Sequence, residues 1–164
     1  MSESGREPLP EPMPERSYRR ASALVRLDHV LGGGDPERPA LTYGDRTLTY
    51  AQLSDQVARV ANGLHTHGVR RGDRVLVYAE KRIETAVALL AIAAAGAVLV
   101  PANPLLRTLQ LAHVIKDCDP RMVITTARRW EAVRPALAPD SSVSSVVLIG
   151  ADSPEPTAAH FFPL

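Results

Sequence analysis

The stretch that decides the fold runs from residue 74 to residue 101 and reads RVLVYAEKRIETAVALLAIAAAGAVLVP. The β-branched run Arg74–Ala79 is typical of a buried strand, whereas the apolar run Ile83–Ala95 is too long for a strand and predicts a helix. Gly96 ends this helix, and Ala97–Val100 predicts a second strand before a proline. A strand, a helix and a strand joined by short connections form a parallel βαβ unit.

The same alternation continues along the chain. Four further elements are predicted: a helix over Thr108–Asp117, a strand over Met122–Thr126, a helix over Arg128–Leu137 and a strand over Val143–Ile149. Strands that are apolar almost throughout are buried on both faces of a sheet. We therefore expect a three-layer α/β fold, with a mostly parallel sheet and helices on both faces.

Three elements are predicted before this unit. They are a helix over Ala21–Leu31, a hairpin of Leu41–Tyr43 with Arg46–Leu48, and a helix that follows Thr49. Thr49 and Gln52 have the spacing of a capping box, in which each side chain bonds the other residue's backbone N–H. Gly68 is placed to end that helix, because glycine adopts a left-handed conformation without strain.

The two ends of the chain differ from the middle. Residues 1–20 contain four Pro, four Glu and four Arg and no targeting signal, so we expect a disordered tail. Residues 21–150 are expected to form the ordered domain, and residues 151–164 a loop that leads to a missing remainder. The strand Val143–Ile149 would then lack a covering helix, and the helix Ile83–Ala95 has almost no polar face. An isolated chain of this kind is expected to self-associate or pack loosely.

Composition excludes several classes of protein. Hydrophobic residues make up 45% and charged residues 23%, and the net charge of +1 indicates no strong attraction to nucleic acid. The single cysteine, Cys118, excludes an internal disulfide and fits a reducing compartment, so a cytoplasmic location is expected. The apolar run Ala86–Val100 is mostly alanine and shorter than the roughly 20 residues of a membrane span. Arg outnumbers Lys 17 to 2, a bias that indicates a bacterial genome rich in G and C.

Four stretches in order resemble the acyl-adenylate-forming (AMP-binding) superfamily. They are RPAL at 38–41, LTYAQL at 48–53, GVRRGDRV at 68–75 and AAGAVLVP at 94–101. The second and fourth are similar to the first two core motifs of the family, which are structural. The run Glu80–Thr85, together with Asn103–Leu106 and Asp117–Asp119, most resembles the AMP-forming acyl-CoA ligases that accompany exosortase systems in bacteria.

The resemblance implies an enzyme that joins a carboxylic acid to CoA at the expense of ATP, releasing AMP and pyrophosphate. The charge that builds up on the phosphates requires Mg²⁺, backbone amides and a lysine held in place. In the family these come from a Ser/Thr/Gly-rich loop, an acidic motif and a carboxy-terminal lysine, and none of these motifs occurs here. We therefore expect an amino-terminal fragment of the large ligase domain, inactive by itself, with no catalytic residues, no metal site and no tight binding of ATP, CoA or Mg²⁺.

Two other interpretations stay open. The chain could be a non-catalytic split-gene product or docking partner of a separate chain that carries the rest of the ligase. It could also be a stand-alone nucleotide-binding module of flavodoxin-like shape, although the sequence offers no phosphate loop. Gly32–Gly34 does not supply one, since these glycines follow a predicted helix and not a strand.

Arg128 and Arg129 are the candidate cofactor-binding residues. They follow the predicted strand Met122–Thr126, and the resemblance implies that a basic segment at this place lies near the 3′-phosphate of CoA. A pair of arginines suits a phosphate because guanidinium groups bind its oxygens in a fork. The alternative is a solvated helix face.

Other polar residues are weaker candidates. Glu80 and Lys81 follow the carboxyl end of a strand, where open α/β sheets bind ligands, but a surface ion pair explains them equally well. His65 and His67 diverge at a helix end and are not expected to bind metal. Cys118 lies at a predicted helix end before Pro120, and it is not expected to act as a nucleophile.

Overall fold

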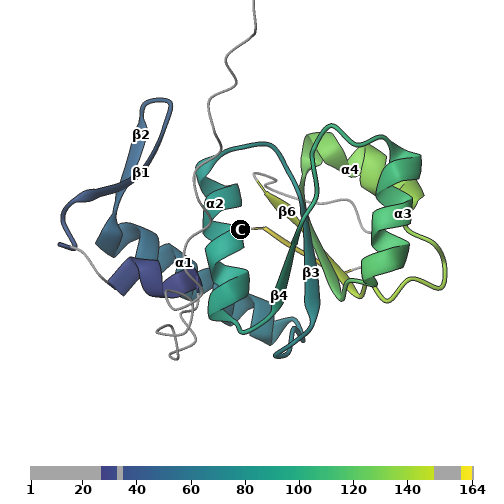
Figure 1. Cartoon of the computed structure of the whole chain (residues 1–164), viewed down its shortest axis with the longest axis horizontal. Helices are drawn as coiled ribbons and strands as arrows, with labels where there is room; N and C mark the ends of the chain where they lie inside the picture. Colours follow the sequence, from purple (N-terminus) through teal and green to yellow (C-terminus); the bar gives the residue numbers. More distant parts are fainter. Residues whose placement is uncertain (1–26, 33–34, 150–159, 164) are drawn as a thin grey trace, which may run out of the picture.

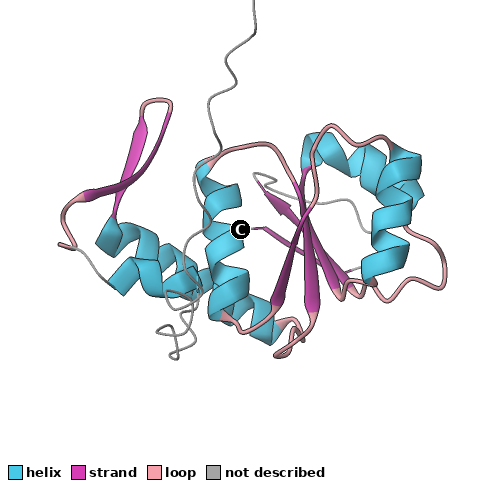
Figure 2. Cartoon of the chain, in the orientation of Figure 1, coloured by secondary structure: helices cyan, strands magenta, loops and turns pink. Residues whose placement is uncertain are grey.

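The structure is a computed structural model that describes residues 27–32, 35–149 and 160–163. A five-stranded sheet lies at its centre, with helices on both sides (Figures 1 and 2). This arrangement confirms the α/β fold with a parallel sheet that the sequence predicts. Residues 1–26, which include the expected tail and most of the expected first helix, lie outside the described residues.

The sheet has the strand order β4-β3-β5-β6-β7, and every neighbouring pair is parallel. Its strands are β3 (Arg74–Tyr78), β4 (Val98–Pro101), β5 (Met122–Thr126), β6 (Ser145–Ile149) and β7 (His160–Pro163). Strand β3 is an interior strand, since its Leu76 lies between Val100 of β4 and Val123 of β5.

Strand β7 corrects the expectation that residues 151–164 form only a loop. His160–Pro163 pairs in parallel with β6, so β6 has a strand on each side. Two consecutive phenylalanines, Phe161 and Phe162, carry high strand propensity. An open sheet edge offers unpaired N–H and C=O groups, and a short segment with that propensity can bond to them.

The helices follow the predicted alternation with two corrections. They are η2 (Leu27–Gly32), α1 (Tyr50–Thr66), α2 (Ile83–Ala94), α3 (Thr108–Cys118), α4 (Ala127–Val133) and η3 (Arg134–Ala136). The described part of the first expected helix is the 3-10 turn η2, which runs into consecutive glycines that disfavour regular helix. The helix expected over residues 128–137 is divided into α4 and η3, because Pro135 lacks the N–H that an α-helix requires.

The two faces of the sheet carry separate cores. On one face, Val75 and Val77 of β3 pack with Val87, Ala91 and other residues of α2. On the opposite face, Leu76 and Tyr78 pack with Leu111 of α3 and Val133 of α4. Successive residues of β3 therefore point to opposite helix layers, as the alternation of side chains along a strand requires.

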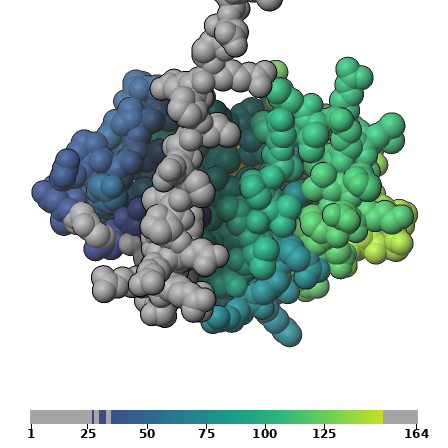
Figure 3. Space-filling view, in the orientation of Figure 1, coloured from purple at the N-terminus to yellow at the C-terminus, as the bar shows by residue number. Residues whose placement is uncertain are grey.

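Helix α2, for which the sequence predicts almost no polar face, is covered within this chain. Helix α1 lies on the outer side of α2 and η2 also contacts it, so α2 is enclosed between the sheet and other helices (Figure 1). Leu53, Val57 and Leu64 of α1 are buried in that contact. The space-filling view shows these first elements in blue and the later helices in green on opposite sides (Figure 3).

The hairpin and the cap of α1 are confirmed. Strands β1 (Pro39–Tyr43) and β2 (Arg46–Thr49) pair in antiparallel fashion around Gly44, which has a φ of +61°. The backbone N–H of Thr49 donates to Gln52 Oε1 at 3.0 Å, and the N–H of Gln52 donates to Thr49 Oγ1 at 3.3 Å. Beyond the end of α1, Gly68 has a φ of +84°, which a residue with a side chain would adopt only under strain.

Candidate functional site

The topological switch point of the sheet lies between β3 and β5. The helix after β3 is α2, which packs on one face of the sheet, whereas the helix after β5 is α4, which packs on the other. Because the two following helices leave on opposite faces, the carboxyl ends of β3 and β5 are not covered by a crossover, and open α/β sheets bind ligands at such a point. Glu80 follows β3 here, and Thr126 ends β5.

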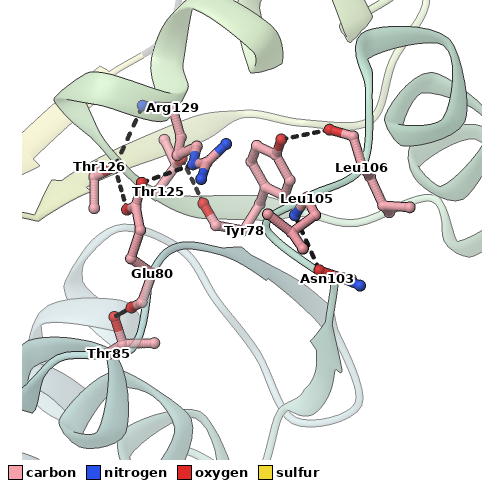
Figure 4. Close-up of polar contacts among 9 residues, drawn as sticks. All are labelled: Tyr78, Glu80, Thr85, Asn103, Leu105, Leu106, Thr125, Thr126 and Arg129. Atoms are coloured by element: carbon pink, nitrogen blue, oxygen red, sulfur yellow. Dashed lines mark hydrogen bonds and ion pairs between the residues drawn. The ribbon is translucent and has the colours of Figure 1, made fainter.

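Glu80 connects the two strand ends. Its Oε1 accepts a hydrogen bond from Nε of Arg129 at 2.6 Å, and its Oε2 accepts one from Oγ1 of Thr126 at 2.9 Å (Figure 4). The backbone carbonyl of Glu80 accepts from Oγ1 of Thr85, in the first turn of α2, at 2.7 Å. One residue thus joins β3, β5, α2 and α4, which are separated by up to 49 positions in the sequence.

Thr126 also starts helix α4. Its Oγ1 accepts from the backbone N–H of Arg129 at 3.3 Å, which satisfies one of the free donors at the helix start. The guanidinium of Arg129 lies over the ring of Tyr78, with 5.9 Å from Cζ to the ring centroid. The Tyr78 hydroxyl in turn donates to the carbonyl of Leu106 at 2.7 Å (Figure 4). The positions of Thr126 and Arg129 are therefore set by several contacts at once.

The ionisation of this cluster follows from its contacts. Partial burial would raise the pKa of Glu80, but hydrogen bonds from its own backbone, Arg129 and Thr126 outweigh it and hold that pKa below its ordinary value. The hydrogen bond to Glu80 raises the pKa of the Arg129 guanidinium. Both groups are therefore charged at neutral pH, and each compensates the other.

A cavity of about 330 Å³ opens beside this cluster. Residues from the ends of β1, β3, β5 and β6 line it: Tyr43, Glu80, Lys81, Arg82, Thr126, Ala127, Arg128 and Ile149. Glu80 is paired with Arg129 and Arg82 with Glu84. Lys81 and Arg128 have no ion-pair partner among residues 27–32, 35–149 and 160–163. The cavity therefore presents a surplus of positive charge, which favours an anionic ligand.

The β1–β2 hairpin is attached to the same region. Arg46 Nη1 donates to Glu84 Oε1 at 2.7 Å, and Arg82 Nε donates to Glu84 Oε2 at 2.9 Å. Burial would raise the pKa of Glu84, but these two arginines and the backbone keep it below its ordinary value. The ion pairs connect the hairpin, the start of α2 and the cavity wall.

The structure separates the two arginines that the sequence presents as a pair. Arg128 is exposed and lines the cavity, whereas Arg129 is half-buried and directs its Nε to Glu80. Glu80 and Lys81 do not pair with each other. Sequence reasoning missed Thr126, Arg82 and Tyr43 as parts of the site. Thr126 could have been found as the capping residue three positions before Arg129, but no sequence signal brings Tyr43 to this edge.

The weaker candidates have structural contacts. His65 Nδ1 lies 3.1 Å from the carbonyl of Val69, and His67 Nδ1 lies 2.8 Å from that of Gly63 at the end of α1. Partial burial raises the pKa of the Cys118 thiol, which disfavours the reactive thiolate. Within the described part of the chain, His, Cys, Asp and Glu form no group of three suited to a metal ion. None of the helices described there has the length and apolar character needed to cross a bilayer.

Fold and site together define the class: an α/β protein with a cationic cavity at the topological switch point of an open parallel sheet. The family follows from comparison with known proteins. The model of the family described as AMP-binding enzyme matches residues 31–161, most of the chain, and the chain belongs to this family.

Relatives and solved structures of this family include acyl-CoA ligases. A feruloyl-CoA synthase of Amycolatopsis sp. is 41% identical over 98 residues, which cover 60% of this chain and 20% of that protein. A putative long-chain-fatty-acid CoA ligase of Rhodopseudomonas palustris superposes with a TM-score of 0.73 at 28% identity, over 83% of this chain and 33% of that one. ATP-bound MatB of the same organism superposes with a TM-score of 0.62 at 31% identity. The match covers 68% of this chain and 23% of that one. The chain thus spans about a fifth of the length of the feruloyl-CoA synthase.

Proposed function

We propose that this chain is the amino-terminal part of a bacterial, cytoplasmic AMP-forming acyl-CoA ligase. Such an enzyme converts a carboxylic acid, ATP and CoA into acyl-CoA, AMP and pyrophosphate. Family membership and the names of the similar ligases support this proposal. The resemblance of residues 80–85, 103–106 and 117–119 supports a place in the subfamily that accompanies exosortase systems.

The observation that carries the proposal is the cationic cavity at the switch point. Arg128 and Lys81 line it without an ion-pair partner among the described residues, so they are available to an anion. We assign the 3′-phosphate of CoA to Arg128, with Arg129 beside it. Arg129 would contribute only its Nη groups, because its Nε donates to Glu80. Guanidinium groups bind phosphate oxygens with directed hydrogen bonds.

In this proposal the chain binds and orients one substrate and supplies no catalytic residue. CoA, when bound, provides the thiol that displaces AMP from the activated acid. The groups that hold ATP and Mg²⁺ and stabilise charge on the phosphates come from the remainder of the ligase, in the same or a separate polypeptide. We expect no exchange of pyrophosphate into ATP by the 164 residues alone, and measured exchange would contradict this division of roles.

Binding of CoA tests the proposal directly. The chain, labelled with ¹⁵N, is titrated with CoA and with 3′-dephospho-CoA, and amide shifts report a weak complex. We expect CoA to bind more tightly, and Arg128→Ala to remove the difference between the two ligands. Arg134→Ala is the matched control, because Arg134 is similarly exposed but lies in η3 and does not line the cavity. Equal binding of both ligands by the unaltered chain would refute the assignment.

A further inference from the structure

The geometry points to Tyr43 as the aromatic wall of a nucleoside phosphate site: its ring contacts the base while Arg128 and Lys81 hold the phosphate. This inference rests on the proposed function, since it concerns the same cavity. It adds a residue from the β1–β2 hairpin, which is remote in sequence from the arginines.

Tyr43 is placed at the cavity by the hairpin turn. It is the last residue of β1 and lines the cavity together with Arg128 and Lys81. Tyr43 is 55% exposed, so its ring is accessible to a ligand. A partly exposed ring next to cationic groups is the arrangement by which proteins stack a base and bind its phosphate.

An ion pair fixes the tip of the hairpin. Tyr43 and Arg46 are cross-strand partners on either side of the two-residue turn, so their Cα atoms lie opposite each other. Arg46 donates to Glu84 at 2.7 Å, and Glu84 also accepts from Arg82, which lines the cavity. Because Arg46 is held at the start of α2, its partner Tyr43 is held at the cavity edge.

The combination of groups selects the class of ligand. Lys81 and Arg128 account for an anion, but a simple anion would gain nothing from an aromatic ring. A nucleoside phosphate uses both, because every base has a face that stacks on an aromatic side chain. Because Tyr43 is already partly covered in the free protein, the gain from stacking should be at the lower end of the usual range, roughly five- to tenfold in affinity.

Two probes distinguish the contribution of the Tyr43 ring to binding from that of the cationic side chains. The chain is titrated with adenosine 3′,5′-bisphosphate and with inorganic phosphate, followed by ¹⁵N amide shifts. We expect Tyr43→Ala to weaken binding of the nucleotide about five- to tenfold and to leave inorganic phosphate unchanged, whereas Tyr43→Phe binds both normally. Leu109→Ala is the control, because Leu109 is a large side chain in α3 that is 86% exposed and does not line the cavity.

The ion pair is tested through the same readout. Glu84→Gln and Arg46→Ala should weaken nucleotide binding, and neither should add to the loss in Tyr43→Ala, because they act through the ring. The inorganic phosphate titration reports any separate effect of Glu84→Gln on Arg82.

The outcomes distinguish this inference from the proposed function. If Arg128→Ala removes nucleotide binding but Tyr43→Ala leaves it unchanged, the role of Tyr43 is wrong and the phosphate site stands. If Tyr43→Phe binds as weakly as Tyr43→Ala, the hydroxyl and not the ring is responsible, and stacking is refuted. If the unaltered chain binds neither probe nor CoA, both the proposed function and this inference are wrong.

Discussion

Replacement of Glu80 tests whether one carboxylate holds the carboxyl edge of the sheet together. Glu80→Ala removes the acceptors of two side-chain hydrogen bonds, from Arg129 Nε at 2.6 Å and from Thr126 Oγ1 at 2.9 Å. A hydrogen bond contributes about 1 kcal/mol net, and the Thr126 hydroxyl, buried at 4% exposure, would lose its acceptor. The side chains of the Arg129–Glu80 ion pair are 25% and 31% exposed, so solvent screening limits the contribution of their charges to stability. We expect the free energy of unfolding to fall by roughly 1.5–2 kcal/mol.

Glu80→Gln removes the negative charge of the side chain but keeps its size and shape. The amide oxygen can still accept one hydrogen bond, so the expected loss is smaller, roughly 0.5–1 kcal/mol at pH 7. The pKa of Glu80 is lowered in the folded protein, so the carboxylate's contribution is fully present above its unfolded pKa and is lost as pH falls through the folded pKa. The stability difference between the unaltered chain and Glu80→Gln should therefore shrink as pH falls below about 4.5.

Urea unfolding followed by fluorescence provides the measurement. Trp130 is the single tryptophan of the chain and lies in α4, next to Arg129, so its emission reports this region. Glu131→Ala is the control. The Glu131 side chain is 76% exposed, and its Oε2 lies 3.9 Å from Nη2 of Arg134, so its ion pair is weak. This substitution should change the free energy of unfolding by less than about 0.5 kcal/mol. A loss in Glu131→Ala as large as in Glu80→Ala, or a Glu80→Gln difference that stays constant at low pH, would refute the reasoning.

Two further predictions concern helix ends. Thr49→Ala should destabilise the chain by about 1 kcal/mol and speed amide exchange at Gln52, because the cap of α1 is lost; unchanged exchange there would contradict the capping role. Arg74→Ala should cost about 1–2 kcal/mol in urea unfolding, because Arg74 donates at 2.7 Å and 2.8 Å to the carbonyls of Cys118 and Asp119 at the end of α3. A lysine has no planar fork with which to reach both carbonyls, so Arg74→Lys should recover only part of the lost stability. Full recovery would show that the positive charge alone is sufficient.

Sequence periodicity was sufficient for the elements whose causes are local. The strand over residues 74–78, the helix from Ile83 and the strand over 122–126 each follow from a run of apolar residues whose length and branching suit one backbone conformation. The capping box of Thr49 and Gln52 involves residues three positions apart, so it too could be predicted. The four stretches over 38–41, 48–53, 68–75 and 94–101, taken in order, also indicated the family that the comparison shows.

Local patterns were insufficient where a segment depends on a distant partner. The pairing of β7 with β6 was not predicted, because His160–Pro163 is too short to show a period and needs an existing sheet edge. The cover of α2 by α1 was also missed. Both helices have apolar surface, but the sequence does not state which surface meets which.

The site shows the same division. Composition and position in the sequence placed Arg128, Arg129, Glu80 and Lys81 at strand ends, where α/β proteins bind ligands. Only the tertiary structure decided that Arg129 turns to Glu80 while Arg128 faces the cavity, and that Arg46 brings the hairpin to Glu84. These ion pairs join residues 49 and 38 positions apart, and the energy of such a contact depends on distance in space and not on order in the chain.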